Sequence, residues 1–216
     1  MKEKKIITRE GNGFLEEKKS KFIAVARPVK TEEEARAFVE EIKKKYRDAR
    51  HNVFAFQVGE QNEIQRYSDD GEPQGTAGLP VLGVITGEGI SDCCIVVTRY
   101  FGGTLLGTGG LVRAYGRAAK EALLDAGIGV VNRYVAVSVK TDYTMQGKLS
   151  YEITKGEYLL EDTIFTDQVE FRLLCAEEEV EDFCKTMQNL TNGQAQISTQ
   201  PPVEGVFVDG KLQVLE

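Results

Sequence analysis

The sequence predicts an α+β protein of two domains, the second with a ferredoxin-like βαββαβ plan. Three observations lead to this fold class. The 216 residues exceed the usual size of one domain, and 41% of them are hydrophobic, which is enough for two cores. Segments of helical periodicity alternate with short apolar strands along the chain. A glycine-containing break at residues 127–129 follows a helical segment, so we expect domains at residues 1–129 and 130–216.

The first elements expected are a hairpin and a helix. Apolar stretches at residues 6–7 and 22–26 flank Gly-Asn-Gly at residues 11–13, which predicts a hairpin that turns at these three residues. Thr31 and Glu34 form a capping box at the start of a helix. Its apolar face recurs at helical spacing through Ala35, Phe38, Val39, Ile42 and Tyr46.

Two strands and a second helix complete the expected first domain. We expect a strand at residues 53–58, with His51 at the start of this segment. Residues 95–98 form a second strand, whose continuous apolar character predicts burial on both faces. Between these strands we expect a polar loop. Residues 111–126 alternate bulky and small apolar side chains at helical spacing, and Gly127 ends that helix.

The spacing of apolar residues predicts the order of strands and helices in the second domain. We expect, in sequence, a strand at 134–141, a helix at 145–153, a strand pair within 162–175, a helix at 180–190 and a strand at 196–200. This order is βαββαβ. Glu177, Glu178 and Glu179 suit the positive end of the second helix, so we interpret them as capping residues.

Charge is distributed unevenly along the chain. The net charge is −7, but residues 1–130 carry 20 Lys+Arg against 19 Asp+Glu, whereas residues 131–216 carry 7 against 15. Any contact with RNA is therefore expected in the first domain. The N-terminus has no apolar signal core and no apolar run is long enough to span a bilayer, so we expect a cytoplasmic protein. Its four cysteines are expected to be reduced.

The first unusual stretch is residues 66–78, in which Asp69, Asp70 and Glu72 are crowded with three glycines and a proline. One interpretation is structural, with aspartates capping backbone N–H groups and glycines supplying positive φ. The functional alternative uses the carboxylates as metal ligands or as general acids and bases. Their spacing matches neither a calcium loop nor a zinc site, so we expect no metal and no cofactor.

The second unusual stretch is residues 98–117, which runs from a buried strand through a glycine-rich loop into a helix, an order that gathers backbone N–H groups against an anion. The P-loop lysine and the last glycine of a dinucleotide fingerprint are both absent. What fits is a general anion or RNA-backbone site, with Lys120 extending the basic helix edge and Tyr100, Phe101 and Tyr115 able to stack bases. The alternative is close packing with a solvated basic face. The candidate residues are Arg99, Tyr100, Gly102, Gly103, Gly107, Gly109, Gly110, Arg113 and Arg117.

His51 is the only histidine, so any histidine-based catalysis has to use it. There is no Gly-x-Ser-x-Gly elbow and no identifiable Ser or Cys partner. A structural or ligand-orienting histidine is the interpretation that we prefer, and we assign no catalytic residue.

These motifs resemble those of the IMPACT family, in its bacterial YigZ-like branch. The first domain of that family is similar to the fold, with a left-handed βαβ unit, that is shared by a small-subunit ribosomal protein domain and an elongation factor G domain. The second resembles the ferredoxin-like end domain of that factor, which agrees with the βαββαβ order. The residues that carry the resemblance are Ser20-Lys21-Phe22, His51-Asn52-Val53, Tyr67 to Pro73 with Gly75 to Gly78, and Thr98 to Gly103 with Leu106-Gly107 and Gly109 to Tyr115.

The resemblance implies translation regulation, because eukaryotic relatives restrain a kinase that phosphorylates an initiation factor during starvation. Two departures limit what carries over to this chain. The eukaryotic relatives carry an additional N-terminal partner-binding module, whereas this chain enters the shared domain almost at once. Leu105 stands where many relatives place a lysine before Leu-Gly, which removes a phosphate contact.

Our leading hypothesis is a non-enzymatic module that binds the ribosome, RNA or a translation factor through the first domain, with no DNA and no membrane partner. The first alternative is a small hydrolase, such as a dipeptidase, that uses His51 with Asp69, Asp70 and Glu72. The second alternative is a protein-binding adaptor that uses the exposed edge of the C-terminal sheet.

Overall fold

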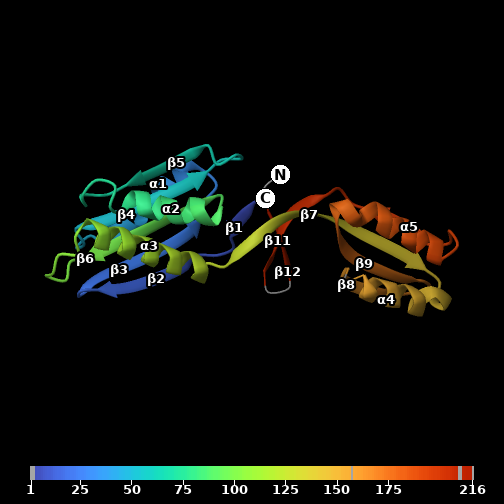
Figure 1. The fold of residues 1–216 in the computed structure, drawn as a ribbon. Helices are drawn as coiled ribbons and strands as arrows, with labels where there is room; N and C mark the ends of the chain where they lie inside the picture. Colours follow the sequence, from blue (N-terminus) through green and yellow to red (C-terminus); the bar gives the residue numbers. More distant parts are fainter. Residues whose placement is uncertain (1–2, 157, 209–210, 216) are drawn as a thin grey trace. The chain divides into compact units, whose positions relative to one another are not determined.

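The computed structural model describes residues 3–156, 158–208 and 211–215, and the chain divides into two compact units, Met1–Val131 and Asn132–Glu216 (Figure 1). The expected boundary, between residues 129 and 130, lies two residues before this division. The first unit has two hydrophobic clusters and the second unit has one.

The first unit is built on a five-stranded antiparallel sheet. β3 and β4 are each antiparallel to β6, which lies between them, so they run parallel to each other and form a βαβ unit with the helix that connects them. That helix is α1 (Glu32–Lys45). In spatial order the strands are β2 (Gly11–Glu17), β3 (Ser20–Pro28), β6 (Cys93–Tyr100), β4 (His51–Val58) and β5 (Ile64–Ser68).

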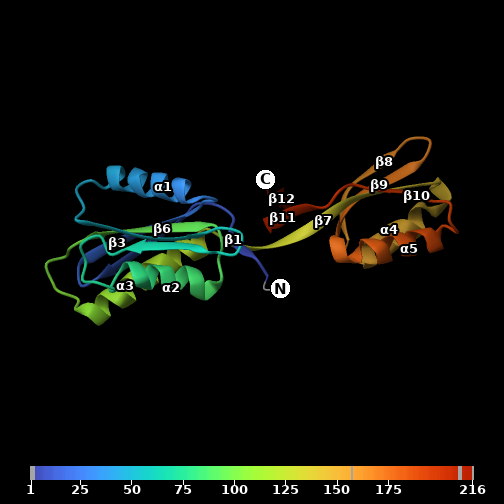
Figure 2. The same ribbon diagram turned by 90° about the horizontal axis from the view of Figure 1, so that it is seen from above.

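Helices cover both faces of this sheet. α1 lies on one face, while α2 (Gly78–Glu88) and α3 (Thr108–Asp125) lie on the other (Figure 2). β6 is buried along nearly its whole length because it is a central strand covered on both sides, as its apolar run predicts. The predicted cap of α1 is confirmed, since Thr31 Oγ1 accepts a hydrogen bond from the backbone N–H of Glu34 at 3.1 Å.

The expected turn at residues 11–13 is wrong, because these residues lie inside β2. The β2–β3 hairpin instead turns at Lys18 and Lys19, which have φ of 45° and 65°. The glycines allow close packing against α3 and the residue that follows it. A Cβ on Gly11 would lie 2.2 Å from the backbone nitrogen of Ala126, and one on Gly13 would lie 2.5 Å from the carbonyl oxygen of Ala118.

The expected polar loop between β4 and β6 is also wrong, because this segment contains β5 and α2. α2 is an apolar helix, and its residues Val81 and Ile85 are fully buried against the sheet. α3 begins at Thr108, three residues before the predicted start, and it ends as predicted just before Gly127, whose φ is 70°.

The second unit has the predicted ferredoxin-like plan. Its strands form an antiparallel sheet in the order β10-β7-β9-β8, and α4 and α5 pack against it through one core. The final hairpin, β11–β12, has no counterpart in the prediction. The elements are β7 (Ile128–Thr141), α4 (Gln146–Lys155), β8 (Leu159–Phe165), β9 (Val169–Ala176), α5 (Val180–Leu190), β10 (Gln196–Thr199), β11 (Val203–Val208) and β12 (Lys211–Val214).

Three further features complete the description. Within the first unit, β1 (Lys5–Ile7) pairs with residues 128–130, the first residues of β7. The four cysteines are free thiols. Among the described residues, no helix combines the length and the apolar character needed to cross a membrane.

Candidate functional site

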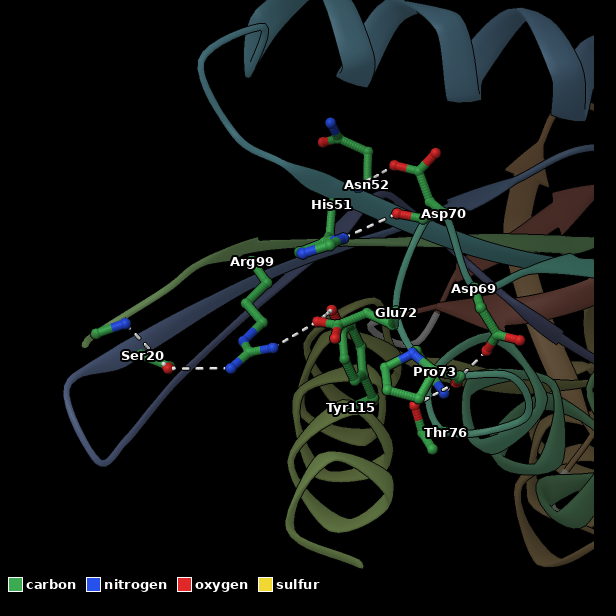
Figure 3. A network of polar contacts seen from close by, with 12 residues as sticks. Ser20, His51, Asn52, Asp69, Asp70, Glu72, Pro73, Thr76, Arg99 and Tyr115 are labelled. Atoms are coloured by element: carbon green, nitrogen blue, oxygen red, sulfur yellow. Dashed lines mark hydrogen bonds and ion pairs between the residues drawn. The ribbon is translucent and has the colours of Figure 1, made fainter. Parts of the chain in front are cut away.

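Both unusual stretches of sequence meet at one end of the sheet of the first unit (Figure 3). β6 ends and β4 begins at this end, and His51 lies directly opposite Arg99 in the antiparallel register. Tyr115 of α3 and the loop of residues 69–77 contribute side chains to the same place. The acidic loop and the glycine-rich segment, which are separate in sequence, therefore form one site.

A buried ion pair lies at the centre of this site. Glu72 Oε1 accepts hydrogen bonds from Arg99 Nη1 at 2.6 Å and from Tyr115 OH at 2.8 Å, and the side chains of Arg99 and Glu72 are only 6% and 4% exposed. Burial raises the pKa of the Tyr115 phenol and the Glu72 carboxylate raises it further, so the phenol is protonated and donates. Arg99 is one of the predicted anion ligands, but the carboxylate of Glu72 already neutralises it.

The other contacts of Arg99 connect it to the β2–β3 hairpin. Its Nη2 donates to Ser20 Oγ at 3.4 Å, and the same oxygen accepts from the backbone N–H of Gly102 at 3.1 Å. The guanidinium carbon lies 5.5 Å from the ring centroid of Phe22 and 5.6 Å from that of Phe101. Arg99 thus holds together the end of β6, the hairpin and the beginning of the glycine-rich loop.

Asp69 caps the start of α2. Its Oδ1 accepts from the backbone N–H groups of Ala77 and Gly78 at 3.0 and 2.8 Å, and its Oδ2 accepts from Gly75 at 2.8 Å. The first N–H groups of a helix have no partner inside the helix, so a carboxylate at this position both satisfies them and matches the helix dipole.

Asp70 ties the acidic loop to the first two residues of β4. Its Oδ2 accepts from the backbone N–H of Asn52 at 2.6 Å, and its carbonyl oxygen lies 2.8 Å from His51 Nδ1. Because a carbonyl oxygen can only accept, Nδ1 carries the proton. Asp70 itself has a φ of 44°, which aspartate tolerates better than most residues. The single histidine therefore positions the loop.

The three carboxylates proposed for a hydrolase consequently each hold a part of the fold. Asp69 binds a helix start, Asp70 binds a strand start, and Glu72 binds Arg99 and Tyr115. Within the described residues, no cluster of three or more His, Cys, Asp or Glu side chains is arranged to hold a metal ion. This geometry favours the structural interpretation of the acidic loop.

Four of the glycines of the second stretch serve either close packing or a positive φ. Gly102 allows close contact, because a Cβ there would lie 2.0 Å from the carbonyl carbon of Lys19. Gly103 and Gly107 have φ of 85° and 73°, and Gly107 lies directly before α3. Gly110 packs against Leu106, whereas Gly109 in the first turn of α3 is exposed.

Beside this loop lies a pocket of about 110 Å³ whose lining includes three cations and one carboxylate, that of Glu17. The cations are Lys18 from the hairpin turn and Arg113 and Arg117 from successive turns of α3, and all three are exposed. None of the three cations has an ion-pair or side-chain hydrogen-bond partner among the described residues. The sequence analysis did not single out Lys18; the available signal was the Lys18-Lys19 pair, which lies in a charged break between the apolar residues 14–15 and the apolar run at residues 22–26.

Three other residues of the predicted anion site are engaged elsewhere. Lys120, expected on the same basic edge, pairs with Glu88 of α2 at 3.0 Å. Tyr100 donates to Asp48 Oδ1 at 2.8 Å, and its side chain is on the opposite side of β6 from that of Arg99. Tyr115 is fully buried. Of the aromatic residues expected to stack bases, Phe101 is the one that is largely exposed.

Comparisons with known proteins give consistent results. The model of the Impact N-terminal domain matches residues 18–123, and the model described as a domain of unknown function (DUF1949) matches residues 139–194. The chain is 44% identical over 181 residues to the IMPACT family member YvyE of Bacillus subtilis, which covers 83% of this chain and 82% of that protein. It is 41% identical over 148 residues to YigZ of Escherichia coli, covering 66% and 68%. A crystal structure described as a hypothetical protein superposes with a TM-score of 0.57 at 30% identity, covering 91% of this chain and 97% of that one.

Proposed function

The chain belongs to the IMPACT family, and from this premise we propose that it is a non-enzymatic, translation-linked regulator that acts in the cytoplasm and binds RNA through its first domain. The RNA can be free or part of the ribosome, since the proposed contact is with the phosphate backbone. The observation that carries the proposal is the group of cations Lys18, Arg113 and Arg117 beside the glycine-rich loop, for which the described residues provide no ion-pair partner.

Cations elsewhere in the first unit are frequently neutralised. Arg27 bonds to both Glu10 and Glu41, Arg36 bonds to Glu32, and Lys120 bonds to Glu88. Within the part of the chain that the structure describes, Lys18, Arg113 and Arg117 have no such partner, and they line one pocket. Phosphates are the natural counter-ions for such a group, and each phosphate bound releases condensed counter-ions from the RNA.

The start of α3 adds to the attraction for phosphate. Arg113 lies in the second turn of α3, and Gly109 and Gly110 lie in its first turn, where backbone N–H groups have no partner within the helix. The positive end of the helix dipole therefore lies one turn away from Arg113.

The test is RNA binding by the full chain as a function of salt. We expect binding to weaken steeply between low and moderate salt, and Arg113→Ala with Arg117→Ala to reduce the slope by about 2, because two phosphate contacts are lost. The matched control is Lys43→Ala with Lys44→Ala on α1, which removes the same charge from the opposite face of the sheet. Binding that does not depend on salt, or an equal loss in both double variants, would exclude this surface.

A further inference from the structure

Phe101 is an exposed aromatic residue in an unusual setting. It directly follows β6, and 51% of its surface is accessible. Its ring lies 5.6 Å from the guanidinium carbon of Arg99, a side chain that Glu72 and Ser20 hold in place. The ring therefore packs against a fixed, buried cation and is still accessible to solvent.

Phe101 is also next to the surface proposed to bind phosphate. Gly102 packs directly against the backbone of Lys19, so the residue before it lies beside the hairpin turn. Lys18, on the other side of that turn, lines the pocket with Arg113 and Arg117. Phe101 is thus adjacent in sequence to a residue that contacts the lysine turn, and that turn lines the pocket with the two arginines.

We infer that the RNA bound at this surface is single-stranded, with an unpaired base stacked on Phe101 and neighbouring phosphates bound by Lys18, Arg113 and Arg117. This inference rests on the proposed function and specifies its ligand. In a duplex the bases are stacked on each other and the A-form major groove is too narrow for side chains to enter, so an aromatic ring finds no base face to contact. A single strand offers both a base face and its phosphates.

The surface is suited to RNA of many sequences. Between Phe101 and α3 the loop contains Leu105, which is 81% exposed, Leu106 and three glycines, and the hydroxyl of Thr104 is its single side-chain group able to hydrogen-bond to the edge of a base. Stacking and phosphate contacts are common to every nucleotide. We therefore expect little discrimination among sequences and clear discrimination between single-stranded and duplex RNA.

The chain contains no tryptophan, so Phe101→Trp introduces one fluorophore at the proposed stacking position. The experiment titrates this variant with a single-stranded RNA oligonucleotide and with the same oligonucleotide annealed to its complement. We expect the single strand to quench the tryptophan and the duplex to leave it unchanged. In the wild-type background, Phe101→Ala should weaken single-strand binding by at least about fivefold and leave its salt dependence unchanged.

Phe14→Ala is the matched control, because Phe14 on β2 is a phenylalanine of similar exposure, 55%, and should bind no base. Melting curves establish that each variant folds. Salt-dependent binding of both RNA forms with equal affinity, without quenching, would overturn the stacking inference and leave the proposed function standing. Binding of neither form would overturn both and would favour a protein ligand for Phe101 and Leu105.

Discussion

Arg99 and Glu72 form a buried ion pair with 2.6 Å between Nη1 and Oε1, although 26 residues separate them in sequence. The pair joins the acidic loop before α2 to the end of the central strand β6, and Tyr115 adds α3 to the same oxygen. Residues 66–78 and residues 98–117, which the sequence analysis singled out as candidate sites, are therefore held together by an ion pair between them. The consequences for stability and binding can be tested separately.

Removing the buried carboxylate should destabilise the first unit strongly. Glu72→Ala leaves the Arg99 guanidinium buried without its counter-charge, and such changes cost about 3–5 kcal/mol. Urea unfolding followed by circular dichroism gives the free energy of unfolding. Glu41→Ala, which breaks an exposed pair with Arg27, is the control and should cost far less. Equal losses in the two variants would show that burial of the Arg99 pair is unimportant.

Asp69→Ala should loosen the start of α2. Three backbone N–H groups lose the carboxylate that accepts their hydrogen bonds, and loss of a helix cap costs about 0.5–2 kcal/mol. Hydrogen exchange should speed up at Gly75, Ala77 and Gly78 before the rest of the unit opens. Unchanged exchange at these amides would contradict the capping role.

Glycine substitutions should have opposite effects at two positions. Gly102→Ala places a methyl group 2.0 Å from the backbone of Lys19, and an overpacked site typically costs about 1–3 kcal/mol. Gly116→Ala, inside α3, meets no atom within 4 Å and should stabilise the helix by about 0.5–1 kcal/mol. Thermal melting of the two variants and the wild type makes the comparison, and a stabilised Gly102→Ala variant would refute the close contact.

The stability of the second unit should fall in alkaline solution. Burial raises the pKa of Cys175 to about 11 from its ordinary value of 9.0. The folded state thus favours the protonated thiol, and this contribution is complete below about pH 9 and is lost as the pH rises towards 11. Cys175→Ala should lower stability at every pH but show a shallower decline between pH 9 and 11, measured by denaturant unfolding. Parallel curves for variant and wild type would argue against this ionisation.

The two units should differ in RNA binding when expressed separately. A fragment of residues 1–131 keeps the pairing of β1 with residues 128–130, which a cut after residue 129 would truncate. We expect this fragment to bind RNA and to sediment with ribosomes at low salt. Residues 132–216 should not, because they carry an excess of negative charge and repel phosphate. Sedimentation with the second fragment alone would transfer the binding surface to that unit.

The sequence by itself determined the elements whose signals are local. Thr31 and Glu34 lie within one turn of α1, and the apolar faces of α1, α3 and α5 repeat within each helix, so periodicity and caps were sufficient. The continuous apolar run of β6 and the βαββαβ order of the second unit were predicted for the same reason. The conformational preference of each of these elements depends on residues that are close together in the sequence.

Only the tertiary structure decided which of the unusual residues are free to bind a ligand. Gly11 and Gly13 suggested a turn, but their small size is needed because the chain returns more than 100 residues later to pack against them. The sequence predicted Arg99 as an anion ligand, but Glu72 neutralises it in the structure. No binding role was predicted for Lys18, yet the fold places it in one pocket with Arg113 and Arg117. A charge attracts whatever lies within a few ångströms, and those distances are set by the packing of distant segments.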